Sequence, residues 1–266
     1  MKSLRLYAIL YLIFLYAPIA LLPVFAFNDA TIIAFPLSGF TTQWFAELPN
    51  IPALIDSLKN SLYIAVITSI LATLLGICAA RAAAKYAFPF KRPIMGFIMA
   101  PLVLPEIIVA VSLLVILLQL GLSLGAWTVI MGHVLICTPF CIAILNSAFQ
   151  NLDPSMEEAA IDLGETPWST FRLVTLPLVS PAIISALLIS FTISLDEFII
   201  AFFLTGTEPT LPVYLWSQLR FPARIPVVMA LGTILVAGSI VLLIIAELMR
   251  RRGLRRAGLK DSGGFL

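Results

Sequence analysis

The chain has 266 residues, of which 61% are hydrophobic and only 11% charged, and its net charge is +2. An ordinary soluble domain is about 45–50% apolar and about 25% charged, and a water-soluble globule of this length cannot bury so much apolar surface. The composition therefore excludes soluble enzymes and disordered proteins and indicates a membrane protein. The net charge is too small to indicate nucleic-acid binding, and the three cysteines, all within apolar runs, indicate no disulfide framework.

Six apolar stretches are long enough, at about 20 residues, to cross a membrane. They predict an all-α, polytopic membrane protein with residues 1–266 in a single transmembrane domain. The first stretch also resembles a signal peptide, but its length and the interruptions at Pro18 and Pro23 favour a retained helix. The expected spans are 6–27, 62–84, 94–119, 127–149, 182–204 and 227–249.

Basic residues predict which side of the membrane each loop faces. They gather before the first span, around the junction of the second and third, and after the sixth, and six spans would put these three segments on one side. The opposite loops are poorer in basic residues, so both termini are expected to be cytoplasmic. The residues behind this expectation are Lys2, Arg5, Arg81, Lys85, Lys91, Arg92, Arg250, Arg251, Arg252, Arg255, Arg256 and Lys260.

The longest outer loop, 28–56, can form a short helix with Trp44, Phe45 and Leu48 on one face, capped by Thr41 or Thr42. Such a helix would lie at the membrane interface with its tryptophan at headgroup depth. An irregular loop packed on the outer helix ends is an equal alternative.

The loop 150–180 joins the fourth and fifth spans and has the pattern of two short helices. Asp153 can cap the first helix, with Pro154 at its first position, and Gly164 can end it. Thr166 and Pro167 can begin the second helix. The first helix would carry the apolar stripe Met156, Ala159, Ala160 and Leu163, the second would carry Trp168, Phe171 and Val174, and Pro177 would help to end it. This apolar surface could lie on the chain's own helix ends or enter a groove on another protein.

The same loop contains Glu158-Ala159-Ala160, Gly164 four residues after Ala160, and Val174-Thr175-Leu176-Pro177 after a gap of nine. This resembles the EAA loop of ABC-importer permeases, with valine where the family usually has isoleucine. The resemblance to the type I importer fold covers most of the chain. The segments Ser194-Leu195-Asp196-Glu197-Phe198 and Gly206 with Leu211-Pro212 further resemble the spermidine/putrescine permeases.

The resemblance implies that the loop is a coupling helix that docks on an ATPase, with Glu158, Ala159, Ala160, Gly164, Leu176 and Pro177 as the docking element. The chain has no G-x-x-x-x-G-K-[ST] phosphate-binding loop of its own. ATP and Mg would therefore be held by an ABC ATPase dimer. The other implied partners are a second permease subunit, expected to be a different chain, an extracytoplasmic solute-binding protein, and the lipid of the bacterial inner membrane.

Three acidic residues lie within expected spans, where each ionisable group costs about 2.5–3.5 kcal/mol and is a functional candidate. At 1.5 Å per residue, Glu106 lies roughly 18 Å and Asp196 roughly 21 Å along spans that both run outward. Together with Glu197 they could line an acidic chamber for a cation such as a polyamine. They could instead pair with polar groups of the partner permease. Pro101 and Pro105 are expected to kink the third span next to Glu106.

His133, Cys137 and Cys141 recur at every fourth residue, but the outer two are too far apart to share a metal ion, so packed residues with satisfied polar atoms are expected. No metal cluster or paired His/Ser arrangement is visible, and no catalytic residue or cofactor is expected. The predicted function is transport by alternating access. The alternatives are a permease for opines, phosphonates or inorganic ions, and a proton-coupled secondary transporter.

Overall fold

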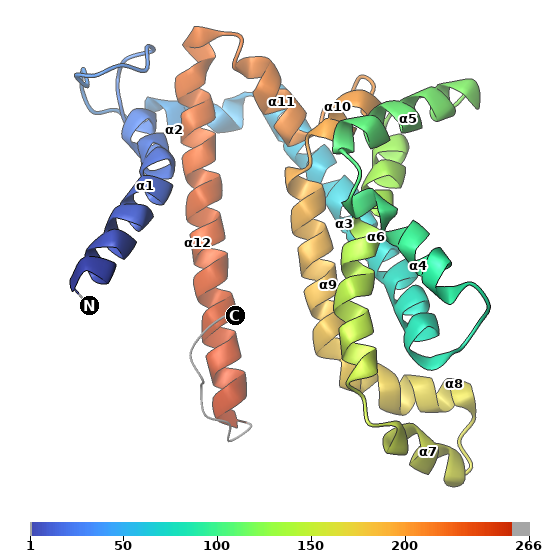
Figure 1. Ribbon diagram of the computed structural model, residues 1–266. Helices are drawn as coiled ribbons and strands as arrows, with labels where there is room; N and C mark the ends of the chain where they lie inside the picture. Colours follow the sequence, from blue (N-terminus) through green and yellow to red (C-terminus); the bar gives the residue numbers. More distant parts are fainter. Residues whose placement is uncertain (1, 257–266) are drawn as a thin grey trace. The chain divides into compact units, whose positions relative to one another are not determined.

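The computed structural model describes residues 2–256 and is helical throughout, apart from turns and one isolated β-bridge between Asn28 and Phe40. Figure 1 shows the arrangement. The helices are α1 (Lys2–Ala26), α2 (Gln43–Glu47), η1 (Leu48–Asn50), α3 (Pro52–Lys85), α4 (Lys91–Met99), η2 (Ala100–Leu102), α5 (Glu106–Gln119), α6 (Ala126–Gln150), α7 (Pro154–Asp162), α8 (Pro167–Thr170), η3 (Phe171–Thr175), α9 (Leu176–Asp196), α10 (Ile199–Leu204), α11 (Leu211–Gln218), η4 (Pro222–Arg224) and α12 (Ile225–Arg256).

Contacts divide the chain into two compact units. The first consists of the described parts of residues 1–52 and 215–266. Within it the C-terminal end of α1 packs on α12, with Leu22 beside Gly232, while the rest of α1 diverges from α12 in Figure 1, and α2 packs on the same helix. The predicted short helix of the outer loop is present as α2 and η1. Trp44 is buried inside this unit and its indole N–H donates to the carbonyl of Asn28 at 2.8 Å, so this tryptophan is a packing residue of the unit.

The second unit, residues 53–214, is built around α6, which packs along α9 and against α5 and α10. Two glycines allow its neighbours to approach closely. A Cβ atom at Gly76 of α3 would lie 2.7 Å from Cβ of Cys141, and one at Gly132 would lie 2.5 Å from a methyl carbon of Ile200 in α10. Small residues at such crossings are what brings helix backbones together where lipid replaces water.

The third expected span, 94–119, is not one helix. The segment Lys91–Leu102 and helix α5 meet at a bend of 101°. Pro105 stands at the N-cap of α5 with an extended backbone, and it has no N–H with which to continue the preceding helix. The predicted kink is therefore present, but it is a full break.

The fifth expected span, 182–204, is also not one helix. Helix α9 begins earlier, at Leu176, and ends at Asp196. Glu197 is extended, with ψ 123°, and α10 begins at Ile199. The side chain of Glu197 satisfies the first free N–H groups of α10. The length of the apolar segment does not reveal such a cap, so it does not predict this break.

Within the described residues, four helices are long and apolar enough to cross a membrane, and the bent pair counts as a fifth. They are Leu4–Ala26, Pro52–Lys85, Ala126–Gln150 and Pro167–Asp196, and the bent pair is Lys91–Leu102 with Glu106–Gln119. The apolar segment Pro222–Gly238 at the start of α12 is shorter. The expected count of six spans is therefore not confirmed.

Candidate functional site

Helix α7 begins as the sequence predicts. The Asp153 carboxylate accepts the backbone N–H of Ser155 at 3.0 Å, and Pro154 occupies the first turn, where a missing N–H has no consequence. This hydrogen bond holds the pKa of the Asp153 carboxyl below its ordinary value. The start of the helix is therefore fixed by a local cap.

Helix α7 ends at a glycine in a left-handed conformation. Gly164 has φ +92°, its N–H donates to Ile161 O at 2.9 Å, and the N–H of Glu165 donates to Ala160 O at 3.1 Å. This pair of bonds is the Schellman pattern. No atom lies within 4 Å of an added Cβ, so backbone conformation and not space selects glycine here.

The second helix does not end where expected. Thr166 caps α8 by accepting the N–H of Ser169 at 3.2 Å, and the chain then continues through the π-helical turn η3 into α9. Pro177 lies in the first turn of α9 and so begins a long helix instead of ending a short one. The wide turn, in which Leu176 N–H bonds to Phe171 O, accommodates the missing proline N–H.

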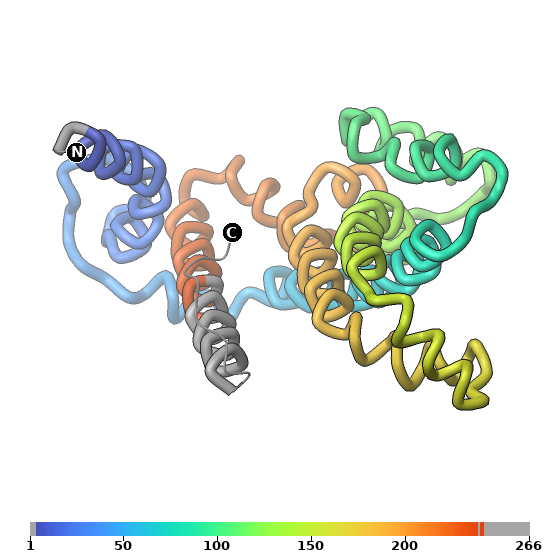
Figure 2. Tube along the Cα trace, turned by 60° about the horizontal axis from the view of Figure 1, so that its bottom comes forward, coloured from blue at the N-terminus to red at the C-terminus, as the bar shows by residue number. Residues whose placement is uncertain are grey.

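The hairpin formed by α7 and α8 projects beyond the ends of α6 and α9 (Figures 1 and 2). Of its predicted apolar stripe only Ala160 is buried, whereas Met156 is 49% and Leu163 87% exposed. Trp168 on α8 is 71% exposed. The described part of the chain thus leaves most of this apolar face uncovered, and Glu158, Ala159 and Gly164 are exposed beside it.

Glu157 is a residue whose role the sequence analysis missed. Its carboxylate pairs with Lys85, lies 3.5 Å from an Arg81 nitrogen, and accepts a hydrogen bond from the Thr175 hydroxyl. Burial raises the pKa of Glu157, but the bonds from Lys85 and Thr175 and the two positive charges outweigh it and lower this pKa below its ordinary value. The available signal was the pair Arg81 and Lys85, one helical turn apart at the end of α3.

The three acidic residues expected in the membrane have different surroundings. Glu106 is not mid-helix but is the first residue of α5, directly after the break, and it is exposed. Asp196 is exposed at the last turn of α9. Glu197, its neighbour, is 8% exposed and faces the interior of its unit.

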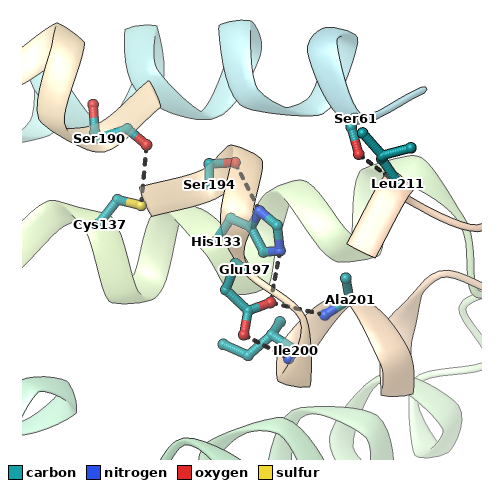
Figure 3. Close-up of polar contacts among 9 residues, drawn as sticks. All are labelled: Ser61, His133, Cys137, Ser190, Ser194, Glu197, Ile200, Ala201 and Leu211. Atoms are coloured by element: carbon teal, nitrogen blue, oxygen red, sulfur yellow. Dashed lines mark hydrogen bonds and ion pairs between the residues drawn. The ribbon is translucent and has the colours of Figure 1, made fainter. Parts of the chain in front are cut away.

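Glu197 has three partners within the chain, drawn in Figure 3. One oxygen accepts the N–H of Ile200 and the other that of Ala201, both at 3.0 Å, and His133 Nε2 lies 3.1 Å from the second oxygen. The opposite ring nitrogen of His133 lies 2.7 Å from the Ser194 hydroxyl. Glu197 therefore caps α10 and holds it against α6.

The structure thus forms a Ser–His–Glu arrangement that sequence spacing did not reveal, because Ser194 and His133 are 61 positions apart. Ser194, His133 and Glu197 are all buried, so no substrate reaches the serine hydroxyl, and the carboxylate is occupied as a helix cap. Cys137 Sγ donates to Ser190 O at 3.7 Å, which fits the expectation of packed residues with satisfied polar atoms. The described residues include no group of three metal-binding side chains.

The sequence pattern of the family described as "Binding-protein-dependent transport system inner membrane component" matches residues 72–254, more than half of the chain. The chain belongs to this family. It is a permease subunit of an ABC importer, a transport component and not an enzyme.

Relatives agree with this assignment, and solved structures share the fold. The putrescine transport system permease protein PotI of Escherichia coli is 35% identical over 259 residues, 92% of each chain. The spermidine/putrescine permease PotC of Escherichia coli is 35% identical over 239 residues, 90% of each chain.

A bacterial alginate ABC transporter with its pentasaccharide-bound periplasmic protein contains a chain of similar fold, with TM-score 0.73, 22% identity and coverage of 94% and 93%. A second alginate-importer structure matches with TM-score 0.71, 17% identity and coverage of 94% and 98%. The resemblance to importer permeases with an EAA loop is confirmed, and α7 carries the Glu158-Ala159-Ala160 part of that motif.

Proposed function

We propose that this permease subunit moves a polyamine such as putrescine or spermidine, by alternating access driven by partner ATPases. The observation that carries the proposal is the 35% identity with the putrescine permease PotI along 92% of both chains. Exposed carboxylates at breaks between membrane helices support it chemically, because a polyamine that loses its hydration needs anionic partners.

The α7–α8 hairpin is the docking element for the ATPase. Its apolar face is uncovered, with Met156, Leu163 and Trp168 exposed, and the two ends of its first helix are fixed by the Asp153 cap and the Gly164 turn. An amphipathic helix with an open apolar face suits a groove on a partner. Among the proposed docking residues, Glu158, Ala159, Ala160 and Gly164 belong to the hairpin, whereas Leu176 and Pro177 begin α9 and connect the hairpin to a membrane helix. ATP and Mg are bound by the partner.

Asp196 is the first candidate for contact with the solute, and Glu106 is the second. Both are exposed carboxylates beside a helix break, and broken helices commonly line a substrate path. Glu197 is a weaker candidate for direct contact, because its oxygens have partners in α6 and α10. Its part in the pathway is to hold the break that ends α9 at Asp196.

The complete transporter contains an ABC ATPase dimer, a second and different permease chain, and an extracytoplasmic binding protein that delivers the solute. It lies in the bacterial inner membrane, with both termini of this chain in the cytoplasm. The cluster of basic residues from Arg81 to Arg92 around the α3–α4 junction supports that orientation.

The test is uptake by the purified transporter in proteoliposomes, with the four kinds of subunit present and ATP inside the vesicles. Labelled putrescine and spermidine should accumulate only with ATP and binding protein, and excess unlabelled polyamine should suppress uptake. Vesicles containing this chain alone under a proton gradient are the matched control. Uptake by those vesicles would indicate a secondary transporter, and ATP-driven uptake of an opine or a phosphonate instead of a polyamine would overturn the solute assignment.

A further inference from the structure

Two adjacent glutamates on α7 have opposite surroundings. Glu158 belongs to the EAA motif and is exposed, whereas the side chain of Glu157 is only 18% exposed. On a helix, neighbouring residues point about 100° apart. One carboxylate is therefore available to a partner protein, and the other is directed toward the chain's own helices.

The carboxylate of Glu157 joins three elements of the second unit. It forms ion pairs with Lys85 and Arg81 of α3. It also accepts a hydrogen bond from the hydroxyl of Thr175, which lies in η3 directly before α9. The Arg81 guanidinium also lies over the ring of Phe171, 4.2 Å from its centroid. Arg81 thus contacts both α7 and η3.

A hollow of about 360 Å³ lies where the ends of α3 and α6 meet the start of α7. Arg81, Lys85 and Glu157 line it, together with Phe149 and Asp153. The ion pairs of Glu157 with Arg81 and Lys85 lie at the wall of this hollow and connect α7 to α3.

We propose that Glu157 is a positioning residue whose ion pairs transmit movement of the docked hairpin to α3, and we call this connection the latch. This role is distinct from the docking role of Glu158. The proposal rests on the proposed function, since it assumes that an ATPase moves α7. The hairpin is continuous with α9 through η3, so that helix follows it directly. Helix α3 is linked to the hairpin through the ion pairs of Arg81 and Lys85 with Glu157. Without these ion pairs, movement of the hairpin would not be transmitted to α3.

The decisive comparison uses Glu157→Gln and Glu158→Gln in the complete transporter, reconstituted with ATPase, sister permease and binding protein. Three quantities are measured: ATPase retained on purification, ATP hydrolysed, and labelled polyamine taken up per ATP. For Glu157→Gln we expect normal ATPase retention with uptake per ATP reduced at least about tenfold, because a charge-assisted bond is lost. For Glu158→Gln we expect the opposite pattern, with less ATPase retained on purification, because this exposed carboxylate belongs to the docking surface.

A double-variant cycle separates a latch from a general structural role. Lys85→Met should lower uptake per ATP in the same way, and the double variant of Lys85→Met with Glu157→Gln should be no worse than Glu157→Gln alone. Additive losses would overturn the latch, because they would mean that the two residues act independently. Glu157→Asp, which keeps the charge, should restore part of the coupling.

The outcomes distinguish this proposal from the proposed function. A wild-type chain that binds no ATPase overturns both. A wild-type complex that couples normally, with Glu157→Gln coupling equally well, overturns the latch alone. Loss of the ATPase from Glu157→Gln would make Glu157 a docking residue and also overturns it. If Glu157→Gln fails to accumulate in the membrane, undiminished coupling by Lys85→Met overturns the latch, and tenfold loss supports it.

Discussion

Nε2 of His133 lies 3.1 Å from a carboxylate oxygen of Glu197, and this buried contact fixes the break between α9 and α10. The same oxygen accepts the N–H of Ala201, and its partner oxygen accepts that of Ile200. Helix α9 ends at Asp196 because the Glu197 side chain, and not a backbone carbonyl of α9, accepts the first N–H groups of α10. Two adjacent acids are thereby separated, Glu197 to the interior and Asp196 to the exposed side.

Glu197→Leu should destabilise the chain strongly. It leaves two backbone N–H groups without their acceptor and removes the carboxylate beside His133 in a buried site, a loss of about 3 kcal/mol. Thermal unfolding of the detergent-purified chain measures this. Glu197→Gln, which keeps an acceptor oxygen, should lose clearly less, and equal stability of Glu197→Leu and wild type would contradict the capping role.

Asp196→Asn should impair uptake without affecting assembly. The amide keeps the size of the side chain but removes the charge that a cationic solute needs, so we expect at least about a tenfold loss in transport efficiency. Initial rates of labelled putrescine uptake are compared with the amount of assembled complex. Glu106→Gln tests the second candidate in the same assay, and unchanged uptake by Asp196→Asn would remove this residue from the pathway.

Gly164→Val should disturb the docking turn while leaving membrane insertion intact. A β-branched residue at φ +92° costs about 1–2 kcal/mol, and the strain is relieved only if the end of α7 moves. ATPase retention on the purified permease should fall. Gly164→Asn is the matched control, because asparagine tolerates this conformation, and it should retain more ATPase than Gly164→Val. Full retention by Gly164→Val would contradict the docking assignment.

Gly132→Val should push α6 and α10 apart. The added side chain meets a methyl group of Ile200 at 2.5 Å, and overpacking of this kind costs about 1–3 kcal/mol. The expected result is a lower unfolding temperature of the purified chain. Gly96→Ala is the control, because no atom lies within 4 Å of a Cβ there, and this variant should unfold like wild type.

The pKa of Glu157 predicts how its ion cluster responds to acid. A pKa below the ordinary value means that the folded chain binds this proton more weakly than the unfolded chain does. The contribution of ionised Glu157 to the stability of the folded chain is therefore complete above pH 4.5, the ordinary pKa. It is lost as the pH falls through the lower pKa that Glu157 has in the folded chain. Infrared difference spectra between wild type and Glu157→Gln follow the carboxylate band of Glu157 as the pH is lowered. A protonation midpoint above pH 4.5 would contradict the stabilisation of this carboxylate by the ion cluster.

The local features of the hairpin were predictable from sequence because each depends on neighbouring residues. The Asp153 cap, the Gly164 stop and the start at Thr166 all appear where the pattern places them. The bend near Glu106 was predicted from Pro105, although its size was not. The continuation through η3 past Pro177 was missed, because a π-helical turn removes the conflict that the proline would cause.

The sequence by itself determined that the chain is a membrane protein, that it belongs to the importer-permease family and that it carries the EAA motif. These features follow from composition and from short fixed spacings along the chain. Only the tertiary structure decided which acidic side chain of each adjacent pair has partners within the chain and which is exposed. Glu197 contacts His133 on another helix, and Glu157 pairs with Lys85, which is 72 positions away in the sequence. Pairings of this kind depend on how helices pack, and a buried carboxylate must find its partners wherever the packing supplies them.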